Sequence, residues 1–259
     1  MQRLSINGTA IDCERYGQGE PLLLLHGAGV SGASWEPQIK TLADRFNLIV
    51  PDIRGHGGSA QHAEPYSIPQ FADDMIALLD ALGIEGALVC GHSMGGAVAQ
   101  QMAARYPTRV KALIIAESNF GFDNPFMQAM MSFSGWLSRM IGIKRLASMT
   151  ARQLANRSPQ AVPVIEAGFA PHIANPENFW NVYQANSQYS GRAELSRIQC
   201  PTLVLIAQNN RATHGYGRTM VQLIPGARLE IIPNAGHLLN WDNTPAFNQA
   251  VLRFFDEVK

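Results

Sequence analysis

Short buried runs alternate with amphipathic helices along most of this chain, and that alternation limits the folds open to it. Continuous apolar runs bounded by glycine, proline or a charge occupy residues 22–25, 48–50, 87–90, 113–116 and 203–206. Runs of this length fit strands that are buried on both faces, as in a parallel sheet covered by helices. Apolar residues recur at helical spacing in segments 67–82, 94–105 and 244–257. The pattern predicts an α/β fold with a doubly wound, mostly parallel sheet.

Charge and cysteine content exclude several classes of protein. Among 259 residues, 20 Lys and Arg balance 20 Asp and Glu, whereas a nucleic-acid groove or an anionic membrane surface needs a basic excess. No apolar run reaches the roughly 18 residues of a membrane span, and no signal peptide is visible. Three widely spaced cysteines, Cys13, Cys90 and Cys200, suit a reducing compartment. We expect a cytoplasmic monomer or homodimer with no nucleic-acid or membrane partner.

One segment, residues 118–195, contains no strand-like run. It holds 10 of the 21 aromatic residues and 5 of the 10 methionines, and prolines divide it into several short helices. We predict a helical cap inserted after the sixth strand, with residues 1–117 and 196–259 forming the core. Its apolar side chains either pack within an ordinary helical insertion or line a substrate pocket on its underside.

The sequence Gly91-His92-Ser93-Met94-Gly95-Gly96 lies between a buried run and a helical pattern. This is the G-x-S-x-G nucleophile elbow in the strand-turn-helix setting that it requires. Glycines allow the strand and the helix to approach closely around a strained turn. The pattern predicts Ser93 as a nucleophile at the carboxyl end of the sheet.

Three further loops follow strands and agree with the elbow: His26–Gly29, Pro51–Ser59 and Pro233–His237. Together with the elbow, they resemble the oxyanion, D-x-R-G-x-G-x-S and histidine loops of the α/β-hydrolase family. The resemblance covers residues 3–257 and implies a serine esterase or lactonase. It implies His237 as the general base, and an oxyanion hole formed by the N–H groups of Ala28 and Met94. Asp52 of the second loop is expected to be structural.

The triad acid departs from the pattern that the resemblance implies. The usual aspartate position, after the strand that contains residues 203–206, holds Asn210. Glu117 directly follows the strand before the cap, and some members of the family place their acid at that strand end. We therefore predict Glu117 as the acid that steadies the His237 imidazolium. An engineered change at Asn210 is the alternative.

Substrate contacts are predicted at the oxyanion loop and among the large side chains near the motifs and in the cap. The residues are Gly27, Trp35, Phe120, Met127, Met131, Trp136, Trp180 and Trp241. We expect His62, His172 and His214 at the surface, and no cluster with metal-ligand spacing is visible, so no metal or cofactor is predicted.

These residues together predict a serine hydrolase that cleaves a carboxylic ester or lactone with an apolar portion, through an acyl-enzyme intermediate. Three alternatives stay open. The first is a carbon–carbon bond hydrolase or lyase of the same fold, and the second is a perhydrolase or cofactor-free haloperoxidase-like activity. The third is a ligand receptor with slow turnover.

Overall fold

The computed structural model describes residues 1–122, 124–155 and 157–258. Its strands are β1 (Gln2–Ile6), β2 (Thr9–Tyr16), β3 (Glu20–Leu25), β4 (Phe46–Pro51), β5 (Ala87–His92), β6 (Val110–Ala116), β7 (Thr202–Ala207) and β8 (Arg228–Ile232). Within the described residues they form one eight-stranded sheet in the order β1-β2-β4-β3-β5-β6-β7-β8. Strand β2 pairs antiparallel with β1 and β4, and every pairing from β4 to β8 is parallel. The predicted mostly parallel sheet is therefore confirmed.

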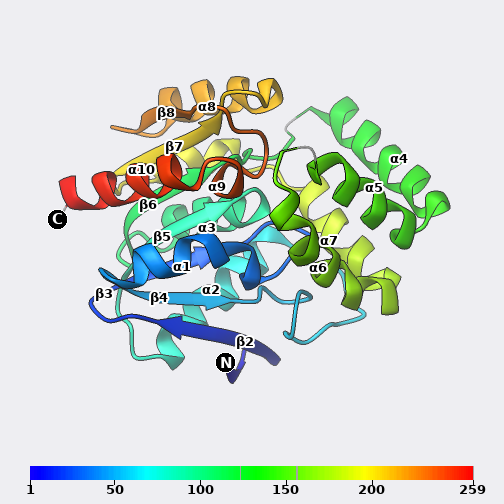
Figure 1. Cartoon of the computed structure of the whole chain (residues 1–259), viewed down its shortest axis with the longest axis horizontal. Coiled ribbons are helices and arrows are strands. Elements are labelled where there is room, and N and C mark those ends of the chain that lie inside the picture. The colour runs from blue at the N-terminus through cyan, green and yellow to red at the C-terminus, as the bar shows by residue number, and fades with distance from the viewer. Residues whose placement is uncertain (123, 156, 259) are drawn as a thin grey trace.

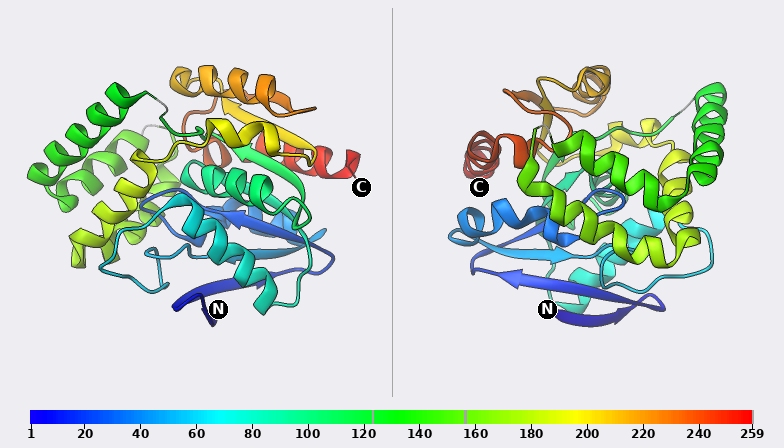
Figure 2. Two further views of the ribbon diagram at one scale, coloured as in Figure 1. Left: turned by 180° about the vertical axis from the view of Figure 1, so that it is seen from behind. Right: turned by 45° about the vertical axis from the view of Figure 1, so that its right-hand side comes forward.

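Helices cover both faces of the sheet (Figures 1 and 2). One face carries α2 (Ile68–Ala81), α3 (Met94–Arg105) and α8 (Arg211–Leu223), and the other carries α1 (Glu36–Ala43), α9 (Leu239–Asp242) and α10 (Thr244–Glu257). Strand β3 shows why its apolar run is continuous. Leu23 and Leu25 belong to the core on the first face, and Leu22 and Leu24 to the core on the second. Successive side chains of a strand point to opposite faces, so both sets must be apolar.

The cap interval holds α4 (Pro125–Ile141), α5 (Ile143–Ala155), α6 (Val162–Ala174) and α7 (Pro176–Ser187), which lie between β6 and β7 in the chain. Figure 1 shows these helices gathered at one end of the sheet, on the right. Helix α6 approaches the loop after β3 so closely that a Cβ at Gly168 would lie 2.7 Å from the Cα of Val30. This helix therefore packs directly over the loop that carries the predicted oxyanion N–H.

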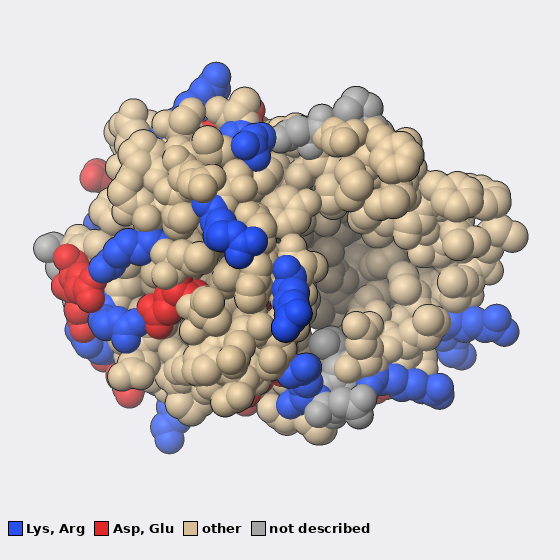
Figure 3. All heavy atoms as spheres, turned by 90° about the horizontal axis from the view of Figure 1, so that it is seen from above, with Lys and Arg blue, Asp and Glu red and all other residues tan. Residues whose placement is uncertain are grey.

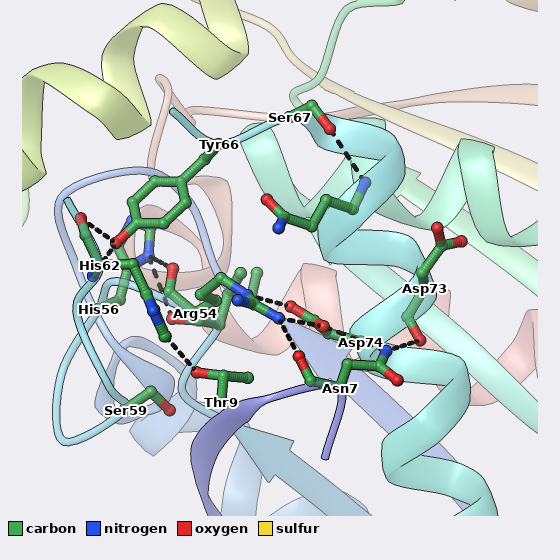
Figure 4. Close-up of polar contacts among 12 residues, drawn as sticks. Asn7, Thr9, Arg54, His56, Ser59, His62, Tyr66, Ser67, Asp73 and Asp74 are labelled. Atoms are coloured by element: carbon green, nitrogen blue, oxygen red, sulfur yellow. Dashed lines mark hydrogen bonds and ion pairs between the residues drawn. The ribbon is translucent and has the colours of Figure 1, made fainter. Parts of the chain in front are cut away.

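The loop after β4 is fixed by side chains of its own motif. Asp52 accepts hydrogen bonds from the N–H groups of Gly32 (2.7 Å) and Gly58 (2.8 Å), which confirms its structural role. Arg54 forms a two-pronged ion pair with the buried Asp74 of α2, with both N–O distances at 2.7 Å. Figure 4 shows this pair and the neighbouring Asn7, whose carbonyl accepts from the same guanidinium. The carboxylates of Asp52 and Asp74 therefore both have structural roles.

A cluster of buried imidazoles joins the cap to the core. His172 of α6 contacts His56, with ring centroids 5.4 Å apart, and His56 contacts His26 at 4.9 Å. All three side chains are fully buried, so the prediction of a surface position for His172 is wrong. The sequence around it gave no sign that α6 packs against the loop after β4. Asn178 of α7 completes the link, because its amide lies 3.0 Å from His172 Nδ1 and donates to the Gly55 carbonyl at 2.7 Å.

Burial gives this cluster a pH-dependent contribution to stability. Burial, the largest cause, lowers the pKa of His26 to about 4 and the pKa values of His56 and His172 to about 3. The unfolded chain therefore binds more protons below pH ~6.5, and stability falls as the pH drops from there toward the folded pKa values. Each buried histidine should contribute a loss of about 1.4 kcal/mol per pH unit in that window.

We therefore expect the free energy of unfolding, measured by urea denaturation, to be several kcal/mol lower at pH 5 than at pH 7. His172→Gln should reduce the slope because one protonation site is removed. A free energy of unfolding that stays level over this range would contradict the buried, neutral state of the cluster.

Candidate active site

Ser93 occupies the turn between β5 and α3 with φ 53° and ψ −119°, a backbone conformation that non-glycine residues rarely adopt. Two contacts hold it there. Its N–H donates to the Ala116 carbonyl at 2.9 Å, and the Ser118 hydroxyl donates to the Ser93 carbonyl at 2.7 Å. The end of the neighbouring strand β6 thus braces the elbow.

Two glycines of the motif are required by close backbone contacts. A Cβ at Gly91 would lie 2.2 Å from the Gly95 carbonyl oxygen, and a Cβ at Gly95 would lie 2.2 Å from the Leu25 carbonyl oxygen. No larger residue fits without moving the backbone. The local sequence therefore sets how the helix begins and presents Ser93.

The oxyanion loop begins immediately after β3, beside the elbow. A Cβ built on Gly27 would lie 3.3 Å from Ser93 Cβ and 3.7 Å from Ser93 Oγ, so this loop faces the serine. Met94 is the first residue of α3, where N–H groups have no partner within the helix. Phe169 of the cap lies against the same loop, since its ring would be 3.1 Å from a Cβ at Gly29. Nothing in the sequence marked Phe169 as a neighbour of this loop.

His237 lies in the loop between β8 and α9, and its side chain is 45% exposed. His92, which precedes the serine, holds this loop: its Nε2 donates to the His237 carbonyl at 2.8 Å, and the two rings are 5.0 Å apart. Burial, followed by the nearby His237, lowers the pKa of His92 to about 4. A neutral His92 suits a role as a hydrogen-bonding support.

Glu117 directly follows β6, and only 1% of it is exposed. Its Oε2 lies 3.5 Å from His237 Nδ1. This is longer than the roughly 2.6–3.2 Å of a tight catalytic hydrogen bond, a looseness common before substrate binds. Like Ser93, Glu117 has a positive φ, 46°, and its own N–H donates to the Leu205 carbonyl at 2.8 Å. The backbone at this strand end therefore turns out of the sheet.

Three donors surround the Glu117 carboxylate. Oε1 accepts from the Ala207 N–H at 2.6 Å and the Thr213 hydroxyl at 2.9 Å, and Oε2 accepts from Asn210 Nδ2 at 2.6 Å. Burial alone would raise the pKa of Glu117, but hydrogen bonds from His237, Ala207 and Asn210 outweigh it and hold the pKa below its ordinary value. Thr213 had no sequence signal, whereas Asn210 was visible only as a missing aspartate.

The large side chains predicted to contact substrate are mostly in packed cores. Trp35 is fully buried against Phe247, so its position gives no support to a substrate contact. Trp241 donates its indole N–H to the Ser34 carbonyl and packs with Trp180 in a buried cluster between cap and core. Phe120 is buried against Tyr216. Gly27, by contrast, lies beside the serine, since a Cβ built on it would be 3.3 Å from Ser93 Cβ.

Helix α4 of the cap differs from the rest, because much of its apolar surface is exposed. Trp136 is 56% exposed and stacks on Phe133, while Met127 and Met131 are half-buried. Its other exposed apolar side chains are Phe126, Met130, Leu137, Met140 and Ile141. The apolar residues of the cap thus divide between a buried cluster on α5, α6 and α7 and an exposed face on α4.

A hollow opens between the core and the cap, as Figure 3 shows when the molecule is seen from above. Lys and Arg side chains lie along its rim, and uncharged side chains cover the wall formed by the cap.

The chain has no group of three or more His, Cys, Asp or Glu placed to hold a metal ion, as far as its described residues go. In the same residues, no helix is both long and apolar enough to cross a bilayer.

Comparison with known proteins places this geometry in a family. Residues 20–163 match the alpha/beta hydrolase fold family. A 3-oxoadipate enol-lactonase 2 from Acinetobacter baylyi is 30% identical over 96% of this chain and 94% of its own. A protein of Azorhizobium caulinodans, provisionally named carbamate hydrolase RutD, is also 30% identical, over 95% and 94% of the two chains.

Among solved structures, the enol-lactonase from Burkholderia xenovorans LB400 superposes with a TM-score of 0.88 at 26% identity, covering 98% of this chain and 100% of that one. The elbow, the oxyanion loop and the histidine loop therefore occur here within a fold shared over nearly the whole length. The chain belongs to the α/β-hydrolase family and is a hydrolase of that type.

Proposed function

We propose that this protein hydrolyses a carboxylic ester or lactone with an apolar portion, through an acyl-enzyme formed on Ser93, with His237 as base and Glu117 as acid. The observation that carries the proposal is the buried, ionised carboxylate of Glu117 beside His237 Nδ1. An anion there stabilises an imidazolium and fixes the ring so that Nε2 is the nitrogen available to the serine. The enol-lactonase names of two similar proteins support an ester-type bond as the substrate.

The proposed reaction proceeds in two acyl transfers. His237 Nε2 takes the proton of Ser93 while Oγ attacks the carbonyl carbon, and the N–H groups of Ala28 and Met94 stabilise the oxyanion. The bond to the alkoxy oxygen then breaks, and the imidazolium returns its proton to the departing alcohol. Water, deprotonated by His237, attacks the acyl-enzyme and releases the acid. With a lactone, the alcohol and the acid remain in one molecule, which leaves as a hydroxy acid.

A panel of p-nitrophenyl esters, lactones and carbamates tests the proposal. We expect a burst of nitrophenol that matches the enzyme concentration, followed by many turnovers. A single turnover without recovery would instead identify a slow receptor. Preferential turnover of carbamates would move the substrate class to the one that the name of the Azorhizobium relative suggests, with the same acyl-transfer steps.

Because aromatic residues and methionines are concentrated in the cap, we expect kcat/KM to rise with acyl-chain length. Each methylene that leaves water is worth about 0.8 kcal/mol, or about fourfold in kcat/KM, until the site is full. The measurement is a series of esters from acetate to octanoate at constant leaving group. A flat or falling series would show that the apolar side chains of the cap serve packing alone.

A further inference from the structure

The side chain at the usual acid position of the fold makes its contact with Glu117. Asn210 is the N-cap residue of α8, and Thr213 lies in the first turn of that helix. Their polar atoms meet the Glu117 carboxylate at 2.6 and 2.9 Å, although the residues are 93 and 96 positions from it in the chain. We propose that Asn210 and Thr213 are positioning residues for Glu117, so that the usual acid position has become a donor site for an acid on the neighbouring strand. The proposal rests on the function proposed above.

The donors leave one direction of the carboxylate open. Oε1 is occupied by the Ala207 N–H and the Thr213 hydroxyl, and Asn210 holds Oε2 from one side. Each carboxylate oxygen can accept two hydrogen bonds, so the second site on Oε2 remains for His237 Nδ1 at 3.5 Å. The Thr213 hydroxyl also lies 2.9 Å from the Asn210 carbonyl, but an ionised carboxylate is the stronger acceptor for its one proton. The three donors therefore aim the carboxylate at the histidine.

The negative charge on Glu117 explains why an amide suits position 210 better than a carboxylate does. A second carboxylate 2.6 Å from Oε2 would leave two negative charges in contact, and the pair would have to share a proton. An amide of the same size instead donates to the charged form and favours it. Acid at the end of β6 and amide at the end of β7 are thus complementary.

Other titratable groups near this pair make separate contacts. His92 faces His237 from β5, and His214 of α8 lies with its Nε2 3.0 Å from the Ala207 carbonyl. Asp242 of α9 accepts from the Gly236 N–H, next to His237, and Arg157 of the cap lies over the same glycine. Among the described residues, none of these four forms a hydrogen bond with the Glu117 carboxylate. Variants at 210 and 213 therefore report on the carboxylate itself.

The first experiment removes the donors one at a time. We expect Asn210→Ala and Thr213→Val each to lower kcat by about tenfold, the rate equivalent of one hydrogen bond to a charged group, with little change in KM or Tm. Thr213→Ser keeps the hydroxyl and should retain activity near that of the wild type. Asn47→Ala, at the distant strand β4, is the matched control for loss of an amide.

The second experiment exchanges the two chemical types. In Glu117→Gln/Asn210→Asp, an amide at 117 faces a carboxylate at 210, and we expect kcat at least about tenfold above that of Glu117→Gln alone. Asn210→Asp alone should move the acid limb of the kcat/KM profile to higher pH, because the two carboxylates share a proton that must be lost before Glu117 is fully ionised beside His237. A residue with only a structural role would give neither the rescue nor the shift.

The outcomes separate this proposal from the one on which it rests. If Glu117→Gln is inactive while Asn210→Ala and Thr213→Val stay within about twofold of the wild type, the triad stands and the positioning role is overturned. Full activity in Glu117→Gln would overturn both. Loss of activity in the donor variants together with rescue by the exchange would establish the pair as a unit.

Discussion

Ser93→Ala is expected to lower kcat/KM for ester substrates by a factor on the order of 10⁴ or more while leaving the fold intact. Alanine keeps the Cβ and the main-chain hydrogen bond to the Ala116 carbonyl, so the elbow should still form. It removes the Oγ that forms the acyl-enzyme, and only catalysis by the oxyanion N–H groups and by substrate binding remains.

Steady-state kinetics and stoichiometric labelling with a fluorophosphonate together measure this loss. Labelling should disappear in Ser93→Ala, and circular dichroism should match that of the wild type. Ser148→Ala, on the exposed side of α5, is the control for loss of a hydroxyl elsewhere. Retention of most of the activity, with contamination by wild-type enzyme excluded, would rule out the serine-hydrolase mechanism.

Glu117→Gln is expected to lower kcat by a factor on the order of 10²–10⁴, because the imidazolium loses the negative charge beside Nδ1. The amide is also a poor fit to its surroundings. Its NH₂ group must face either the Asn210 amide or the pair formed by the Ala207 N–H and the Thr213 hydroxyl, all of which are donors to the carboxylate. The side chain should therefore lose its fixed orientation as well as its charge.

The pH profile of kcat/KM gives a second readout for this variant. Since the pKa of Glu117 is held below its ordinary value, the carboxylate stays ionised at neutral pH and its loss withdraws support from the imidazolium. We expect the acid limb to move to lower pH in Glu117→Gln. Glu64→Gln, an exposed glutamate, is the matched control. An unchanged rate and profile would place the acid elsewhere.

The sheet and the elbow could be predicted from the sequence alone, because both depend on patterns of neighbouring residues. Continuous apolar runs report burial on both faces of a strand, and β3, β5, β6 and β7 lie where those runs are. The glycines at 91 and 95 are required by backbone contacts around Ser93, so the motif itself specifies the turn. The sequence also showed that position 210 lacks an acid and that Glu117 follows a buried run.

The cap was harder to predict, because helical periodicity says that a face is apolar but not what covers it. Segment 118–195 is rich in aromatic residues. Some of them belong to a buried cluster around Phe169 and Trp180, and others lie on the exposed face of α4. The clearest wrong prediction is the surface position of His172, whose side chain is buried. Its burial depends on the packing of α6 against a loop more than 100 residues earlier in the chain, and no local pattern encodes that contact.

Taken by itself, the sequence determined which polar residues follow the strands: Ser93 after β5, Glu117 after β6, Asn210 after β7 and His237 after β8. Only the tertiary structure decided how they meet. Parallel pairing of β5, β6 and β7 brings three of those strand ends to one edge of the sheet. Glu117 has a positive φ, and its side chain contacts both His237 and the donors of α8. Spacing along a chain gives the order of such groups, but the direction of a carboxylate depends on contacts made across the sheet.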